Sequence, residues 1–169
     1  MMLTCQARAE QAPQNRKVHI ETWGCQVNVA DSEKMLSSIK ANYTYTEDVT
    51  LADLIILNTC HIREKAYHKV VSRLGVLSRE KAKRPNLKII VSGCIAQAEG
   101  KKLAEKISCV DIVMGPGRLG ELPELLEKSS QSQSAVIATG FPLTKKREPE
   151  PNKPTKPVAV LPERNQISR

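Results

Sequence analysis

Cysteine is the residue type whose number and spacing in this sequence point most directly to chemistry. The 169 residues contain five cysteines: Cys5, Cys25, Cys60, Cys94 and Cys109. No two of them form a CxxC motif, and none belongs to a CxxxCxxC motif, so neither a zinc knuckle nor a thioredoxin motif is present. The odd number, in a chain whose first residues are polar and show no apolar signal core, argues against a disulfide framework. We therefore expect a cytoplasmic protein with free thiols or metal ligands.

Three of the cysteines occupy the same place in a repeated pattern. Each follows a predicted strand: Cys25 ends the segment IETWGC, Cys60 ends LIILNTC and Cys94 ends IIVSGC. Successive members are 35 and 34 residues apart. The carboxyl ends of parallel strands lie along one edge of an α/β sheet, where ligands bind. Three thiols that follow three such strands can therefore converge.

Thiolates are soft ligands, typical of zinc, copper(I) and iron-sulfur clusters. A structural zinc site takes four ligands, whereas a 4Fe-4S cluster held by three cysteines leaves one iron open. Each of the three cysteines precedes a predicted helix, whose positive N-terminus favours thiolate. The alternative is three buried small hydrophobic residues. We interpret Cys5, in a polar terminus, as incidental and Cys109, beside an apolar run, as a core residue.

The elements that must position these cysteines can be predicted from hydrophobic patterning. Short aliphatic runs, each bounded by polar residues or glycine, predict buried strands over residues 18–23, 54–58, 88–92 and 110–114. Apolar stripes at helical spacing predict helices over residues 30–40, 62–77, 96–107 and 119–127. Strands that alternate with helices predict a mainly parallel sheet with helices on both faces, a three-layer α/β fold.

The charge divides the chain into three parts. The whole chain carries 26 Lys+Arg against 18 Asp+Glu, a net charge of +8. Residues 17–128 contribute 17 basic and 14 acidic side chains, and residues 129–169 contribute 7 and 3. Six of the ten prolines also lie in residues 129–169, which we expect to be a disordered basic linker or tail. We therefore expect a flexible N-terminus over 1–16 and one domain over 17–128, with no run of about 20 apolar residues to span a membrane.

Basic residues gather in one stretch of the predicted domain. Residues 61–88 hold nine lysines and arginines against two glutamates. This stretch is either a solvated helix face or a phosphate-contacting surface beside the cysteine edge. Aromatic residues make up only 3%, so base stacking on this chain is not expected. The candidate nucleic-acid contacts are Arg63, Lys65, Lys69, Arg73 and Lys81.

A glycine pattern and two histidines could also indicate binding sites. Gly115, Gly117 and Gly120 spell GxGxxG, but the acidic residue expected about 20 positions later is missing, so we predict a turn and a helix start. His61 and His68 could be metal ligands, but His61 adjoins Cys60 at a predicted helix start and His68 lies among basic residues, so for each we predict a surface role.

Four residues beside the cysteines could act on a bound group. Asn28, Asn58 and Gln97 could donate hydrogen bonds to cluster sulfurs or position a sulfur donor, and the asparagines could equally serve in caps or turns. Trp23 could shield a cluster from water.

The motifs around the cysteines resemble a known family. The sequence resembles the N-terminal domain of the radical S-adenosylmethionine methylthiotransferases over residues 17–128, in the segments TWGCQVNVADSE, ADLIILNTCHIREKA, SGCIAQ and DIVMGPGRLGELPELL. The GCQxN form is similar to the branch that makes 2-methylthio-N6-dimethylallyladenosine in tRNA.

The resemblance implies a site and a reaction. Cys25, Cys60 and Cys94 would hold an auxiliary 4Fe-4S cluster, whose open iron is thought to carry the sulfur or methylthio group. That group would be inserted at C2 of the N6-dimethylallyl (isopentenyl) adenosine of tRNA, the expected partner. In the family, S-adenosylmethionine and a second 4Fe-4S cluster belong to a barrel domain with a CxxxCxxC motif, and a C-terminal domain helps to hold tRNA.

Because the sequence ends about where the family enters the barrel, we expect a truncated, monomeric chain that binds the auxiliary cluster but completes no turnover alone. Two alternatives stay open at this point. One is a dehydratase-type domain in which the open iron acts as a Lewis acid. The other is a non-catalytic metal-binding or nucleic-acid-binding module.

Overall fold

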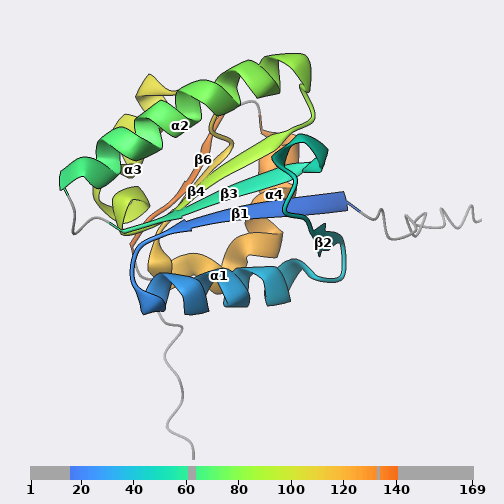
Figure 1. Cartoon of the computed structure of the whole chain (residues 1–169), viewed down its shortest axis with the longest axis horizontal. Helices are drawn as coiled ribbons and strands as arrows, with labels where there is room; N and C mark the ends of the chain where they lie inside the picture. Colours follow the sequence, from blue (N-terminus) through green and yellow to red (C-terminus); the bar gives the residue numbers. More distant parts are fainter. Residues whose placement is uncertain (1–15, 61–63, 133, 141–169) are drawn as a thin grey trace, which may run out of the picture.

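The fold is built on one parallel sheet. The computed structural model describes residues 16–60, 64–132 and 134–140. Within these residues the six strands lie in the order β2-β1-β3-β4-β5-β6, and every neighbouring pair is parallel (Figure 1). The predicted α/β class is confirmed. The remaining residues, including Cys5, His61, Arg63 and the expected tail beyond Gly140, lie outside the described residues.

Strands and helices alternate along the chain as the patterning predicts. Each predicted strand and helix has its counterpart, although the ends differ by a few residues. The elements are β1 (Arg16–Trp23), α1 (Gln26–Ile39), β2 (Tyr43–Tyr45), the 3-10 turn η1 (Val49–Leu51), β3 (Leu54–Thr59), α2 (Glu64–Lys83), β4 (Lys88–Gly93), α3 (Cys94–Lys106), β5 (Ile112–Met114), the 3-10 helix η2 (Pro116–Glu121), α4 (Leu122–Gln131) and β6 (Val136–Ala138).

Two short strands were not predicted. β2 pairs with β1, and β6 pairs with β5 through the partners Ile112 and Val136, Val113 and Ile137, and Met114 and Ala138. Each has three residues, and β2 (YTY) contains no aliphatic run. β6 lies within the segment 129–169 that was expected to be a linker, and α4 also continues past residue 128. The packed domain therefore extends beyond that expected boundary.

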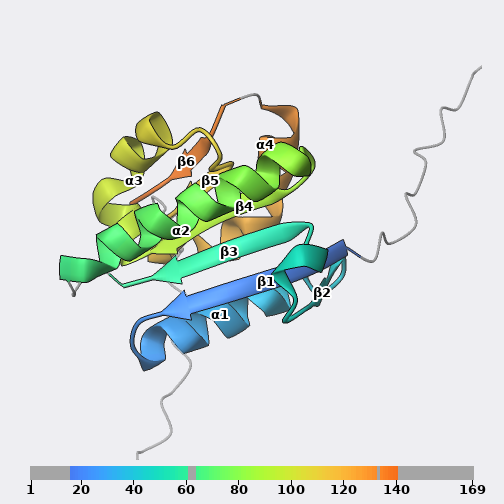
Figure 2. The ribbon, with the colours of Figure 1, turned by 45° about the horizontal axis from the view of Figure 1, so that its top comes forward.

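Helices cover both faces of the sheet and make three layers. Helices α2 and α3 lie on one face, and α1 and α4 lie on the other (Figures 1 and 2). Successive strand side chains point to opposite faces, so Ile55 and Leu57 pack under α2 while Leu54 and Ile56 pack under α1. The central strands are therefore apolar on both sides, as a buried parallel sheet requires.

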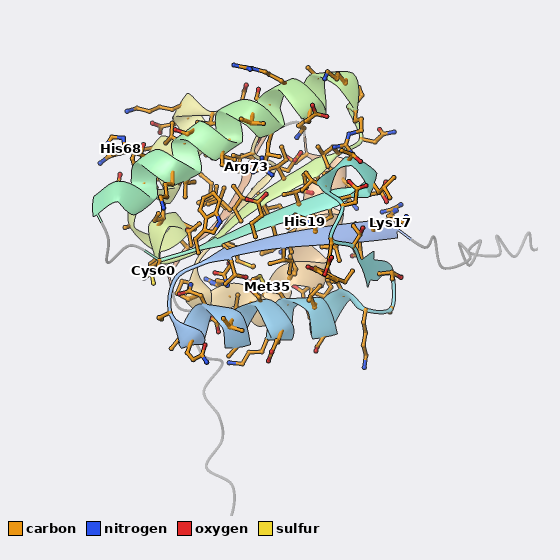
Figure 3. All side chains as sticks on the ribbon, viewed as in Figure 1. Lys17, His19, Met35, Cys60, His68 and Arg73 are labelled. Carbon is orange, nitrogen blue, oxygen red and sulfur yellow. The ribbon has the colours of Figure 1, made fainter. Side chains whose placement is uncertain are left out.

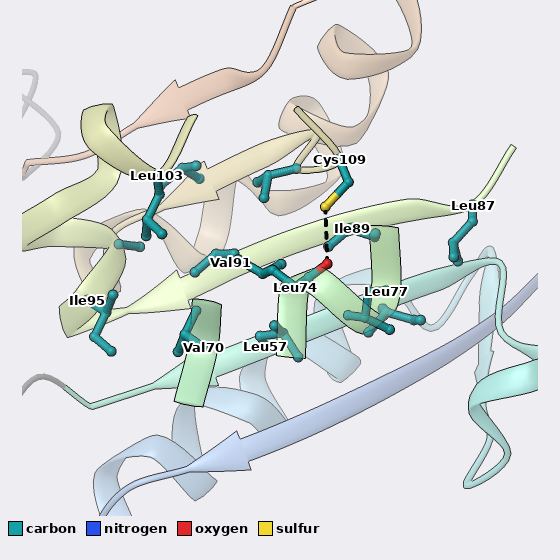
Figure 4. Packing of buried hydrophobic residues seen from close by; sticks show 14 of the residues in the cluster. Leu57, Val70, Leu74, Leu77, Leu87, Ile89, Val91, Ile95, Leu103 and Cys109 are labelled. Atoms are coloured by element: carbon teal, nitrogen blue, oxygen red, sulfur yellow. Dashed lines mark hydrogen bonds between the residues drawn. The ribbon is translucent and has the colours of Figure 1, made fainter. Parts of the chain in front are cut away.

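The core beneath α2 contains Cys109, as predicted. Its side chain is buried with Leu74, Leu77 and Ile89, and its Sγ lies 3.6 Å from the carbonyl oxygen of Leu74 (Figure 4). Burial raises the pKa of the Cys109 thiol above its ordinary value. This cysteine is therefore a protonated packing residue.

None of the helices in the described ranges is both long and apolar enough to cross a membrane.

Gly93, at the junction of β4 and α3, is required by its backbone conformation. Its φ is +93°, and an added Cβ would lie 2.2 Å from the carbonyl oxygen of Thr59. Gly75, inside α2, has no such constraint, since an added Cβ there would have no described atom within 4 Å other than those of its chain neighbours and of its own helix backbone.

We predict that Gly93→Ala destabilises the domain by about 1–3 kcal/mol, because the new Cβ meets backbone and φ is strained. The control, Gly75→Ala, should stabilise it by roughly 0.5–1 kcal/mol, because alanine favours a helix interior. Chemical denaturation followed by circular dichroism measures both free energies of unfolding. Equal effects of the two substitutions would contradict the assigned conformation of Gly93.

Candidate functional site

Strand register brings three cysteines to one edge of the sheet. β1, β3 and β4 are neighbours, and their ends are aligned, since Trp23 is the partner of Thr59 and Thr59 is the partner of Gly93. Cys60 and Cys94 each come one residue after such a partner, and Cys25 comes two residues after Trp23. Neighbouring strands are about 4.8 Å apart, so the three cysteines occupy consecutive positions along the carboxyl edge.

Close packing at Gly24 ties the first two cysteines together. A Cβ added to Gly24 would lie 2.9 Å from Cys60 Cβ and 2.2 Å from Asn28 Oδ1. The backbone N–H of Cys60 also donates to the carbonyl oxygen of Trp23 at 3.0 Å, which continues the pairing beyond the end of β3. The chain between β1 and α1 therefore passes directly against Cys60.

The three thiols differ in exposure. Cys25 immediately precedes α1 and Cys94 begins α3, and both are exposed, whereas Cys60 is 7% exposed. Figure 3 shows Cys60 at the end of β3, at the edge from which α1 and α2 start. The N-termini of α1 and α3, whose N–H groups favour an anionic ligand, both lie at this edge.

The backbone positions and the donor chemistry fit a shared soft-metal group. In the described part of the chain, however, no three or more His, Cys, Asp or Glu side chains are arranged so that they could hold a metal ion. Cys25, Cys60 and Cys94 follow three neighbouring strands whose ends are in register. The fit therefore lies in the order and spacing of the segments.

A buried polar layer lies directly below the cysteine edge. Thr22, Asn58 and Ser92 are register partners on the three central strands. Asn58 Nδ2 donates to the carbonyl oxygen of Asn28 at 2.7 Å and to Ser32 Oγ at 3.0 Å, and Thr22 Oγ1 lies 2.7 Å from Ser32 Oγ. Asn58 is fully buried within β3 and bonded inside the protein, so it serves in neither the cap nor the turn that was the structural alternative for it.

Sequence reasoning missed Thr22, Ser32 and Ser92. A signal was available for Ser92, which is a polar residue directly after the apolar run IIV of β4. Ser92 Oγ is fully buried and, within the described residues, has no hydrogen-bond partner.

Gln97 and Trp23 have structural contacts as well. Gln97 Oε1 accepts a hydrogen bond from the backbone N–H of Gly140 at 2.8 Å, which ties α3 to the end of the sheet. Trp23 is half-buried against the core under α2. The expected turn and helix start after Gly115 is confirmed, since η2 leads from there into α4.

The basic candidates on α2 occupy different environments. Arg73 forms an ion pair with Glu21, with Nε 2.8 Å from Oε1, and Lys81 Nζ bonds to Asp111 and to the carbonyl oxygen of Cys109 (Figure 3 for Arg73). Lys69 is exposed. The side chain of Lys65 lies outside the described residues, as does Arg63. Exposure of His68 confirms its predicted surface position.

These environments predict the order in which the cysteines react. Iodoacetamide at about pH 8 should modify Cys25 and Cys94 first, because only these two cysteines are exposed in the described chain. Cys109 should react last, because it is buried and its thiol pKa is raised. Peptide mass spectrometry over a time course measures each rate. In denaturant the rates should become similar; equal rates for Cys25 and Cys109 in the folded chain would contradict the packing described.

Comparison with known proteins identifies a family to which this chain is similar. Residues 17–115 match the model of "Uncharacterized protein family UPF0004". The chain is 46% identical over 153 residues to a protein of Shewanella frigidimarina named tRNA-2-methylthio-N(6)-dimethylallyladenosine synthase, covering 87% of this chain and 32% of that protein. A protein of the same name from Shewanella loihica is 47% identical over 141 residues, covering 81% of this chain and 30% of the relative.

The chain thus spans about a third of the length of these curated relatives. Their names support methylthiotransferase activity in the family and do not favour the dehydratase-type or non-catalytic alternatives.

Proposed function

Since the chain belongs to Uncharacterized protein family UPF0004, the N-terminal domain of methylthiotransferases, we propose that it holds the auxiliary cluster of a tRNA-modifying methylthiotransferase. The modification is the addition of a methylthio group at C2 of N6-dimethylallyl adenosine. The observation that carries this proposal is the placement of Cys25, Cys60 and Cys94 at consecutive positions on one sheet edge.

The three cysteines would be the ligands of a 4Fe-4S cluster. Such a cluster, when bound, supplies an open iron that can take a sulfur-containing group. This chain's own contribution would be three cysteine ligands, two at the starts of α1 and α3 and one directly after β3. Cys60, the least exposed of the three, would be the ligand nearest the protein interior.

Radical chemistry is assigned to groups outside these 169 residues. The sequence has no CxxxCxxC motif, so we place S-adenosylmethionine and a second 4Fe-4S cluster elsewhere in the functional enzyme. The chain alone would therefore bind the auxiliary cluster without completing a turnover. A cytoplasmic location is part of the same proposal, which the proposed tRNA substrate supports.

Reconstitution tests the ligand assignment. After anaerobic incubation with iron and sulfide, the chain should bind about four irons and four sulfides and show the broad visible absorption of a 4Fe-4S cluster. Cys25→Ala, Cys60→Ala and Cys94→Ala should each lose most of the bound iron, because each removes one of three ligands. The control Cys5→Ala should keep it. A cluster that survives all three substitutions would refute the assignment.

Binding of tRNA tests the role of the basic helix. We predict that Lys69→Glu weakens binding and lowers the slope of log affinity against log salt by about 1, because a phosphate contact is lost. Lys128→Glu is the matched control, since Lys128 is equally an exposed lysine but lies on α4, across the sheet. Fluorescence anisotropy with labelled tRNA at several salt concentrations provides the measurement.

The same effect from both lysines would indicate that binding depends only on total charge. Arg73 and Lys81 are poorer test positions, because charge reversal there would also break ion pairs within the fold.

A further inference from the structure

A buried amide side chain, that of Asn28, forms hydrogen bonds with Cys25. Asn28, in the first turn of α1, is 4% exposed. Its Oδ1 lies 3.3 Å from the backbone nitrogen of Cys25 and 3.5 Å from Cys25 Sγ, and both groups donate to it. Its backbone N–H in turn donates to the carbonyl oxygen of Cys25 at 3.0 Å. Asn28 therefore holds Cys25 from two sides.

The same amide is anchored to the strand that carries the second cysteine. Asn28 Nδ2 donates to Asn58 Oδ1 at 3.3 Å, and Asn58 Nδ2 donates back to the carbonyl oxygen of Asn28 at 2.7 Å. Asn58 is two residues before Cys60, within β3. A continuous path of hydrogen bonds thus leads from Cys25 through Asn28 to β3.

Because the hydrogen bonds between Asn28 and Asn58 are buried, they favour one arrangement of α1 on the sheet. A buried amide without partners is costly, and a satisfied one restricts its neighbours to a single arrangement. Asn58 Nδ2 also donates to Ser32, which pairs with Thr22 on β1, so α1 is bonded to two of the three cysteine-bearing strands. Apolar packing alone would allow α1 to slide along the sheet more easily than this set of bonds does.

We infer that Asn28 is a positioning residue, which holds the Cys25 segment at a set place relative to Cys60 through its bonds with Asn58. The inference rests on the proposed function in that the two cysteines share a bound group. The bond from the Cys25 backbone N–H does not involve the thiol, so it remains available when the thiol is deprotonated and ligates a metal. Asn28 would act through Cys25 and Asn58 rather than by touching the cluster.

The first test uses the metal-free chain. Asn28→Ala should raise the hydrogen-exchange rate of the Cys25 amide by roughly fivefold, the equivalent of one lost hydrogen bond, as measured by nitrogen-15 NMR. Asn28→Asp should restore slow exchange, because a carboxylate oxygen can accept the same N–H. The matched control is Ser92→Ala, in the same buried layer and also two residues before a cysteine, whose hydroxyl has no partner within the described residues.

The second test uses the chain loaded with iron and sulfide. Asn28→Ala should shift the electron paramagnetic resonance spectrum and the midpoint potential of the cluster and shorten its half-life in air, whereas Ser92→Ala should leave all three at their wild-type values. A merely structural role would change the unfolding temperature of both variants without this difference in the cluster signals.

Two results would overturn the inference. One is a Cys25 amide that exchanges at the wild-type rate in Asn28→Ala, and the other is a cluster spectrum and half-life that match those of Ser92→Ala. If Asn28→Ala does not fold, Asn58→Asp decides in its place. It removes both donations from Asn58 Nδ2 and should speed exchange of the Cys25 amide, and an unchanged rate would again overturn the inference.

The outcomes separate this inference from the proposed function. A wild-type chain that takes up no iron-sulfur cluster would contradict the function, while the amide-exchange comparison in the metal-free chain would still decide whether Asn28 positions Cys25.

Discussion

In-register parallel pairing of β1, β3 and β4 is the constraint on which the rest of the structure depends. Because these three strands are neighbours and end at matched residues, the segments that leave them start from one line. Cys25, Cys60 and Cys94 are distant in sequence, and only this pairing brings them together. A shift of one residue in the register would also turn every apolar strand side chain to the wrong face. Core packing and the cysteine edge therefore support each other.

The edge is held by more than apolar packing. The aliphatic core ends one position before the last residues of β1, β3 and β4. At that position the three strands carry the polar side chains of Thr22, Asn58 and Ser92. Two glycines allow the chains to approach there, Gly24 against Cys60 and Gly93 against Thr59. Polar bonds and close backbone contacts restrict geometry more than aliphatic contacts do, which suits a place where three ligands must meet one group.

Some of the basic side chains on α2 form ion pairs within the fold, and others are exposed to solvent. Arg73 bonds to Glu21 on β1, and Lys81 bonds to Asp111 beside β5, so these two cations join α2 to the sheet. Arg84, just after α2, donates to the carbonyl oxygens of Thr50 and Ala52. The net charge of the stretch therefore overstates what is available to a polyanion. Lys69, exposed on the same helix, is better placed for that purpose.

The sequence by itself determined the α/β class, the four main strands and helices, the packing role of Cys109 and the equivalence of three cysteines, because each follows from local periodicity and spacing. It did not reveal β2, which has no aliphatic run, or β6, which lies in the segment expected to be a linker, because both depend on pairing with the neighbouring strands β1 and β5. Only the tertiary structure decided that Asn28 bonds to Asn58 and that Arg73 bonds to Glu21. These pairs are 30 and 52 residues apart, and hydrogen bonds of that range depend on how the sheet and helices pack.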